Sequence, residues 1–192
     1  SLRFQKLDAI LITHEHYDHV GGIDDLRPFG KFGDINLYAE KNVCEAITVR
    51  MPYCFHDIKY PGIPEITINE INLAPFFVEN IKITPIRVMH FKLPIVGYRI
   101  GNMAYLTDLK YLPEEELDKL QNLDTLIIDA LRINEHISHE NLSDALENIK
   151  RIAPQKAYLI HMSHQFGLHA LMEKTLPENV FLSYDDLEIE ST

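Results

Sequence analysis

The sequence is poor in cysteine and has no long apolar run, and each shortage excludes a class of protein. Its two cysteines, Cys44 and Cys54, are too few for a disulfide framework and form no CxxC metal pair. No stretch approaches the roughly eighteen consecutive apolar residues of a membrane-spanning helix. The first residues show no basic segment followed by an apolar stretch and a cleavage site, so no secretory signal is recognisable. We therefore expect a cytoplasmic protein that does not enter a membrane.

Basic residues are also scarce relative to acidic ones. The 192 residues include 18 Lys and Arg against 29 Asp and Glu, a formal net charge of −11. A protein that binds long nucleic acids needs clustered Lys and Arg, so extended nucleic acid is not an expected partner. A small anion held by metal ions stays compatible with this charge. The length and the 46% of hydrophobic residues are ordinary for one globular domain with a sizeable core.

Hydrophobic patterning predicts an α/β protein. Strands dominate the first half of the chain and strands alternate with helices in the second half, which indicates sheets sandwiched by helices. Gly101-Asn102 lies between two apolar runs and predicts a hairpin turn. The expected strands are residues 7–13, 35–39, 65–73, 81–89, 95–100, 103–106, 125–130, 156–160 and 180–183; the expected helices are 23–29, 40–51, 113–120, 141–152 and 168–176, and 52–64 is expected to be a loop.

What the sequence has in excess is histidine, ten in all, with three of them inside residues 14–19. The segment HEHYDH follows directly on the first predicted strand. Residues i and i+2 of an extended segment point the same way, so His14 and His16 can converge on one ion. The chain then turns, which brings Asp18 and His19 within reach of a second ion. Imidazole and carboxylate are preferred ligands of zinc and similar divalent metals, so the segment predicts part of a two-metal hydrolase site.

Three more ligand-type residues stand at the ends of predicted strands. His90 follows strand 81–89, Asp108 follows strand 103–106, and His161 follows strand 156–160. Taken singly, each has an alternative interpretation: a strand-end histidine is often a surface or capping residue, and Asp108 could cap a turn. Taken together, they complete two coordination spheres, with a carboxylate as the natural bridge between two cations.

These motifs resemble those of the metallo-β-lactamase fold superfamily. HEHYDH, followed in order by His90, Asp108 and His161, resembles the superfamily pattern from Leu7 to the C-terminus. The segments GGIDDLRPF (residues 21–29) and HMSH (residues 161–164) resemble its phosphoribosyl 1,2-cyclic phosphate phosphodiesterase branch. The resemblance implies a single domain over residues 1–192 with an αββα sandwich. Relatives carry a further β-rich segment before the HEHYDH strand, so we expect the domain to be incomplete at its N-terminus.

The resemblance also implies roles for individual residues. One metal ion would be held by His14, His16 and His90, and the other by Asp18, His19 and His161, with Asp108 bridging the two. The ions would be zinc or manganese, and iron also fits such a ligand set. A small, cyclic phosphodiester would be hydrolysed by metal-bound hydroxide that Asp18 orients, while His139 protonates the leaving alkoxide.

Physical reasoning about His139 agrees with that role. His139 stands just before the amphipathic helix predicted over 141–152, and a helix N-terminus favours an anion. The alternative is an ordinary residue of the first helical turn. His136 and His164 are further candidates for substrate contact, whereas His56 and His169 have no supporting context and are interpreted as structural.

Two charged residues near the motifs are open to more than one interpretation. Arg27 is an attractive cation for a phosphate, or it pairs with Asp24 or Asp25 instead. Asp129 ends a buried strand and either orients a histidine of the site or forms a structural ion pair.

Other functions fit the same pattern of residues. Lactone or thioester hydrolysis would use the same two-metal site, because the pocket decides the substrate. A non-catalytic, metal-stabilised sensor or scaffold is the alternative from a different class. The sequence does not decide between a monomer and a homodimer.

Overall fold

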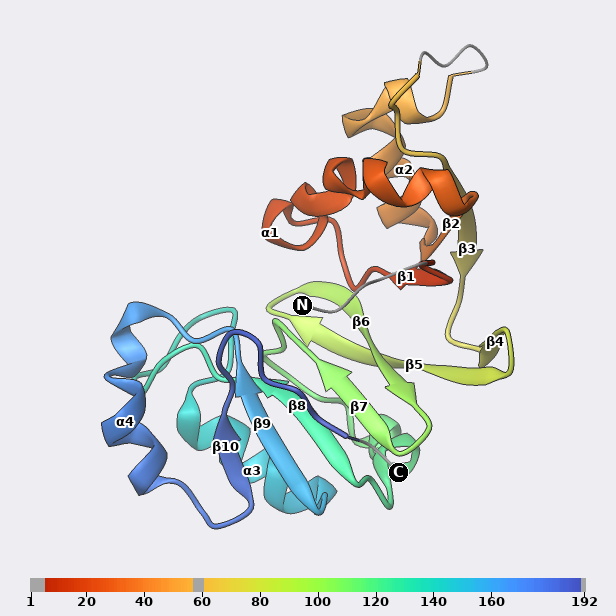
Figure 1. Cartoon of the computed structure of the whole chain (residues 1–192). Coiled ribbons are helices and arrows are strands. Elements are labelled where there is room, and N and C mark those ends of the chain that lie inside the picture. Colours follow the sequence, from red (N-terminus) through yellow and green to blue (C-terminus); the bar gives the residue numbers. More distant parts are fainter. Residues whose placement is uncertain (1–5, 57–60, 191–192) are drawn as a thin grey trace. The chain divides into compact units, whose positions relative to one another are not determined.

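The computed structural model describes residues 6–56 and 61–190. The chain divides into two compact units, Ser1–Asn80 and Ile81–Thr192, which Figure 1 colours from red to yellow and from green to blue. Each unit has a hydrophobic core of its own. The prediction of a single, N-terminally incomplete domain over residues 1–192 stays a prediction.

The first unit is built on a parallel three-stranded sheet. Its strands are β1 (Ala9–Leu11), β2 (Ile35–Glu40) and β3 (Ile66–Ile71), with β2 in the centre. Strand β1 is shorter than the predicted strand 7–13, because only three of its residues pair with β2. The chain after β1 is still held to the sheet, since the N–H of Ile12 donates to the carbonyl of Tyr38 at 3.0 Å. The HEHYDH segment therefore starts from a fixed point at the end of a strand.

Helices of two kinds complete the first unit. They are α1 (Tyr17–Val20), η1 (Gly21–Phe32), α2 (Lys41–Arg50) and η2 (Pro52–Cys54), and a short strand, β4 (Phe76–Val78), follows β3. Helix α2 confirms the predicted helix 40–51 and buries Val43 and Ile47 in the core of the unit. The predicted helix 23–29 is a longer 3-10 helix that continues past Pro28. Proline has no N–H to donate, and the tighter 3-10 turn tolerates the irregularity at this position.

The second unit is built on a mixed sheet in the order β10-β9-β8-β7-β6-β5. Its strands are β5 (Ile81–His90), β6 (Leu93–Ile100), β7 (Met103–Leu106), β8 (Thr125–Asp129), β9 (Lys156–Ile160) and β10 (Val180–Leu182). The predicted hairpin at Gly101-Asn102 is confirmed, since β6 and β7 are antiparallel with Ile100 opposite Met103. Strands β7, β8 and β9 are parallel, and β5 runs the same way because β6 is antiparallel to both of its neighbours. The carboxyl ends of β5, β7, β8 and β9 therefore meet at one edge of the sheet.

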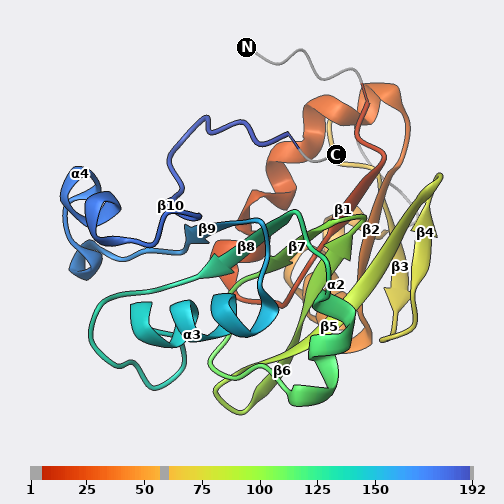
Figure 2. The same cartoon turned by 90° about the horizontal axis from the view of Figure 1, so that it is seen from below.

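Helix α3 (Leu142–Ile152) covers one face of this sheet beside β8 (Figure 2). It buries Ala145, Ile149 and Ile152, and Asn141 caps it by accepting the N–H of Asp144 at 2.9 Å. The remaining helices are short: η3 (Glu114–Leu120), η4 (His164–Phe166), α4 (His169–Met172) and η5 (Glu173–Thr175). Segments predicted as regular helices at 113–120 and 168–176 are thus wholly or partly 3-10. None of the helices in the described ranges is both long and apolar enough to span a bilayer.

Candidate metal centre

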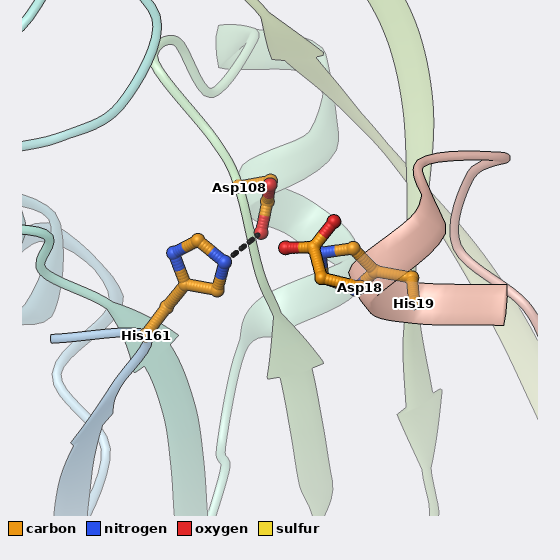
Figure 3. A group of neighbouring side chains, drawn as sticks. All are labelled: Asp18, His19, Asp108 and His161. Atoms are coloured by element: carbon orange, nitrogen blue, oxygen red, sulfur yellow. Dashed lines mark ion pairs between the residues drawn. The ribbon is translucent and has the colours of Figure 1, made fainter. Parts of the chain in front are cut away.

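In the first unit, the HEHYDH segment brings its ligand-type side chains together. The Nε2 of His14 lies 3.0 Å from the Nδ1 of His16, and the ring centres of His14 and His19 are 4.2 Å apart. Figure 3 shows Asp18 and His19 projecting from α1, where the Oδ2 of Asp18 lies 3.3 Å from the Nε2 of His19. These contacts arise because residues i and i+2 of an extended segment, such as His14 and His16, point the same way. The single turn of α1 then brings Asp18 and His19 back toward them.

The position of this segment is fixed by contacts on both sides. His14 is fully buried, and its Nδ1 lies 3.0 Å from the hydroxyl of Thr13. The guanidinium of Arg50, at the end of α2, donates to the carbonyl of Glu15. The motif is therefore a rigid connection between β1 and α1, which is what a metal site requires of its ligands.

In the second unit, the predicted ligands lie at the sheet edge where the strands end. The Nε2 of His161 lies 3.3 Å from the Oδ1 of Asp108, the pair that Figure 3 marks with a dashed line. One side-chain ligand atom from each of His90, Asp108 and His139 lies within 4.8 Å of the others, and the same holds for Asp129, His139 and His161. Strands β5, β7, β8 and β9 supply these residues or the loops that carry them. The carboxyl ends of parallel strands thus bring residues that are far apart in sequence into one ligand cluster.

Two of these positions have an unusual backbone. Asp108 has a φ of 55° and His161 a φ of 58°, in the left-handed region that non-glycine residues avoid. Such conformations cost on the order of 1 kcal/mol or more and persist where the surrounding structure imposes them. Here each follows a strand that is paired on both sides. The backbone turns sharply out of the sheet at the residue whose side chain carries the ligand atom.

Hydrogen bonds fix how His90 and Asp108 present their ligand atoms. The Nδ1–H of His90 donates to the carbonyl oxygen of Asp108 at 2.8 Å, since a carbonyl can only accept. In the neutral ring this bond places the proton on Nδ1, so Nε2 is the nitrogen that can bind a metal ion. The hydroxyl of Thr107 donates to the Oδ1 of Asp108 at 2.8 Å and orients that carboxylate.

His139 stands at the same edge on the loop between β8 and α3. Its ring centre is 4.6 Å from that of His90 and 5.1 Å from that of His161. Its Nδ1 lies 3.4 Å from the Oδ2 of Asp129, which is fully buried and accepts the N–H of Leu109 at 3.1 Å through its other oxygen. Of the two interpretations of Asp129, contact with a site histidine is the one that this geometry favours.

Burial changes the ionisation of the carboxyl groups behind His139. Burial, followed by the negative charge of Asp108, raises the pKa of Asp129 well above its usual value. Burial also raises the pKa of Glu140 from 4.5 to about 9, with the charge of Asp129 as the next cause. The Nδ2 of Asn148 on α3 donates to Glu140, and the backbone of Glu140 bonds to Leu109 and Leu131. Glu140 therefore anchors the loop that carries His139 to both α3 and the sheet edge.

The other candidates are placed less centrally. Arg27 forms two hydrogen bonds with Asp24, at 2.6 and 3.2 Å, and a third with the carbonyl of Gly62 at 2.7 Å, which favours the ion-pair interpretation over a phosphate contact. His136 lies with its ring centre 5.1 Å from that of His139, and burial and the neighbouring His139 lower its pKa. His164 is exposed on η4, and the ring of His169 lies against Tyr184.

Similarity to known proteins agrees with this architecture. Residues 2–162 match the β-lactamase superfamily domain. The chain belongs to this superfamily. The predicted metallo-β-lactamase fold is confirmed by similarity to the crystal structure of a diphosphatase from the PhnP family. It superimposes with a TM-score of 0.89 at 28% identity, over 98% of this chain and 73% of that one.

Two curated relatives of this β-lactamase superfamily chain are longer than it is. An octanoyltransferase of Porphyromonas gingivalis is 42% identical over 185 residues, which are 95% of this chain but only 38% of that protein. A ribonuclease Z of Bacillus licheniformis is 24% identical, over 84% of this chain and 59% of its own length. The chain therefore spans about two fifths of the first of these two relatives and three fifths of the second.

Sequence reasoning overlooked two residues that the structure ties to the site. Thr107 holds the carboxylate of Asp108, and a hydroxyl residue directly before a predicted ligand was an available signal. Glu140 is only 1% exposed, although a glutamate at the start of an amphipathic helix normally lies in solvent. No pattern in the sequence distinguishes it from the acidic residues that surround it.

Proposed function

We propose that this chain is a dinuclear metal-dependent hydrolase that cleaves a small phosphodiester, with cyclic phosphodiesters as the expected class of substrate. The observation that carries the proposal is the pair of ligand sets: four histidine and carboxylate side chains in HEHYDH, and His90, Asp108 and His161 at one sheet edge. Membership of the β-lactamase superfamily and similarity to a ribonuclease Z and to a PhnP-family diphosphatase support phosphate chemistry.

The residues present fit divalent metal ions. The donors are imidazoles and carboxylates, and the tautomer of His90 presents a lone pair at Nε2. We assign His14, His16 and His90 to one ion and Asp18, His19 and His161 to the other, with Asp108 shared by both. Zinc or manganese ions would supply Lewis-acid polarisation of the phosphoryl oxygen and a water molecule of lowered pKa.

The protein's own side chains would position and move protons. Asp18 would accept a hydrogen bond from the attacking water and hold it in line with the departing oxygen. His139 would donate the proton that the leaving alkoxide needs, with Asp129 accepting from its Nδ1–H so that the Nε2 proton faces the substrate. The 3.4 Å approach of the His139 Nδ1 to the buried Asp129 Oδ2 supports this orientation of the imidazole.

The decisive experiment is hydrolysis of bis(4-nitrophenyl) phosphate after reconstitution with Zn²⁺ or Mn²⁺. We expect turnover that a chelator abolishes and added metal restores, followed by turnover of ribosyl cyclic phosphates. His139→Ala should slow the reaction while metal content, measured by mass spectrometry, stays at two ions per chain. A protein that binds two ions and hydrolyses none of these esters would contradict the proposal.

Acyl hydrolysis is the second candidate, and two observations favour it. The P. gingivalis relative is named as an octanoyltransferase, although only 38% of that protein aligns. Large apolar side chains are also exposed on the loops that follow the strands of the second unit, among them Ile137 at 71% and Leu168 at 72%. Parallel assays with an octanoyl thioester and the phosphodiester separate the two: a higher kcat/KM for the thioester would favour acyl chemistry.

Diphosphate hydrolysis is a variant of the first candidate, because the similar protein of the PhnP family is a diphosphatase. The proposal places the enzyme in the cytoplasm, with a small phosphodiester rather than extended nucleic acid as its partner. Its oligomeric state, monomer or homodimer, is measurable by light scattering.

A further inference from the structure

A pocket of about 390 Å³ lies in the first unit beside the HEHYDH segment. Its walls come from α1, the start of η1, the end of α2 and η2, and its aromatic and charged lining includes Tyr17, Arg50 and Tyr53. Small-molecule sites commonly begin at about 300 Å³, so the pocket can take a ring or a sugar but not a large ligand.

Tyr17 is the exposed wall of this pocket. It stands between two predicted metal ligands, His16 and Asp18, and is 78% exposed. Its ring is seated on Gly21, where a Cβ atom would lie only 3.0 Å from the ring. Contact with Gly21 holds the Tyr17 ring in a fixed position, and its exposed face can stack on a ligand next to the predicted metal ligands.

A polar cluster holds another part of the pocket lining, Tyr53 and Asp24. The hydroxyl of Tyr53 donates to Asp24 at 2.5 Å, and Arg27 donates to the same carboxylate. The hydrogen bond from Arg27, the largest cause, lowers the pKa of Asp24, while the bond to Asp24 raises the pKa of Tyr53 to about 12. Tyr53 therefore stays a neutral phenol, and the charge of Asp24 is matched by Arg27.

Arg50 supplies hydrogen-bond donors to the pocket. It is exposed at the C-terminal end of α2, and its guanidinium donates to the carbonyl of Glu15 inside HEHYDH. A guanidinium carries five N–H donors in a planar fork, so one bond leaves others for a ligand. A planar donor set beside an aromatic face suits a flat ring that carries hydrogen-bond acceptors in its plane.

We propose that this pocket binds an aromatic ring on the non-leaving side of the phosphodiester, with Tyr17 stacking on the ring and Arg50 donating to an acceptor at its edge. The inference deepens the proposed function and rests on it. A nucleobase and a simple aryl group share the ring, but only the nucleobase has carbonyl acceptors for Arg50.

Three esters with the same 4-nitrophenolate leaving group test the proposal. They are the methyl, phenyl and thymidine 5′ esters of 4-nitrophenyl phosphate, assayed on the metal-loaded protein. Stacking predicts that kcat/KM for the phenyl and thymidine esters exceeds that for the methyl ester by about tenfold, mainly through KM. An additional gain for thymidine over phenyl would support donation from Arg50 to a nucleobase, and equal values for these two esters would overturn the role of Arg50.

Variants assign the effect to each wall. Tyr17→Ala should abolish both preferences and Tyr17→Phe should retain them. Arg50→Ala should lower the ratio of kcat/KM for thymidine to that for phenyl and keep the ratio of phenyl to methyl. Each ratio is taken within one variant, so an effect on the HEHYDH segment that is common to all three esters cancels. Val49→Ala is the matched control, because Val49 precedes Arg50 on α2, is 79% exposed and does not line the pocket. Equal kcat/KM values for all three esters in the wild-type protein would overturn the proposal.

A binding measurement separates failure of the subsite from failure of the proposed function. Saturation-transfer NMR on the metal-free protein should show transfer to the thymine protons of thymidine 5′-phosphate, lost in Tyr17→Ala. Hydrolysis of none of the esters would refute the phosphodiesterase proposal. Absence of saturation transfer in the wild-type protein would refute the ring subsite, whatever the esters show.

Discussion

Replacing Asp129 by asparagine tests whether a buried carboxylate orients the proposed proton donor. Asp129 lies with Oδ2 3.4 Å from the Nδ1 of His139 and accepts the N–H of Leu109 through Oδ1. Asparagine keeps an oxygen for Leu109 but can place an N–H donor toward His139. The imidazole would then turn, or change tautomer, and its Nε2 would no longer carry the proton for the leaving oxygen.

The expected loss follows from the length of this contact. Replacing the partner of a functional histidine typically costs 10- to 100-fold in metal affinity or activity. Since 3.4 Å is longer than the usual N–H···O distance, we expect the lower end, about tenfold in kcat, or roughly 1.4 kcal/mol in activation free energy. The loss should be larger for an alkyl leaving group than for 4-nitrophenolate, because 4-nitrophenolate is the weaker base and leaves readily without a proton, whereas an alkoxide needs one.

The assay compares kcat for the two leaving groups in Asp129→Asn and the wild-type protein, with metal content measured on the same samples. Asp118→Asn on η3, an exposed carboxylate, is the matched control and should leave both rates unchanged. An equal loss for both leaving groups would contradict proton donation through His139. Loss of metal from Asp129→Asn would instead assign Asp129 to the support of His161, with which it shares a ligand cluster.

Three further perturbations address the same edge of the sheet. Asp108→Ala should weaken the binding of both metal ions and abolish turnover; full occupancy with a normal rate would remove its bridging role. His139→Ala should keep both ions and lower kcat by about 100-fold, and an unchanged rate with an alkyl leaving group would exclude it as the acid. Burial raises the pKa of Glu140 from 4.5 to about 9. Between pH 4.5 and pH 9 the native protein therefore keeps a proton on Glu140 that the unfolded chain has lost. The contribution of this proton to the free energy of unfolding is fully present below pH 4.5 and is lost as the pH rises toward 9. Urea unfolding should therefore show the free energy of unfolding of Glu140→Gln rising relative to wild type from pH 5 to pH 8.5, and a pH-independent difference would mean that Glu140 is ionised in the native state.

The parts of the fold that were predictable are those with a strong local signal. Strand 156–160 and the Gly101-Asn102 hairpin have the residues expected, because continuous apolar runs and a glycine turn determine them locally. Strand ends could be located to within a residue or two, and this was enough to nominate His90, Asp108 and His161 as neighbours. Parallel strands bring their carboxyl ends to one edge whatever lies between them in sequence.

The contacts behind the site could not be predicted, because they depend on how a loop folds back. The pairing of Asp129 with His139 requires the segment between β8 and α3 to return to the strand end it left. Arg27 had several acidic neighbours within reach, and only the three-dimensional path of η1 selects Asp24. The 3-10 helices escaped prediction because they share the composition of α-helices and differ only in their hydrogen bonding.

The backbone at Asp108 and His161 shows why propensity is a poor guide at such a site. A left-handed conformation favours glycine, and among other residues it is most often tolerated by asparagine, aspartate and histidine, so local preference permits but does not predict the φ of 55° at Asp108 and 58° at His161. Both positions follow strands whose pairing on each side fixes the direction in which the chain must leave the sheet. The sheet therefore imposes a conformation that the residues themselves disfavour, and the side chain gains a fixed direction at the sheet edge. A glycine at either position would relieve the backbone and remove the ligand atom, so the presence of Asp and His there is itself an argument for a role in binding.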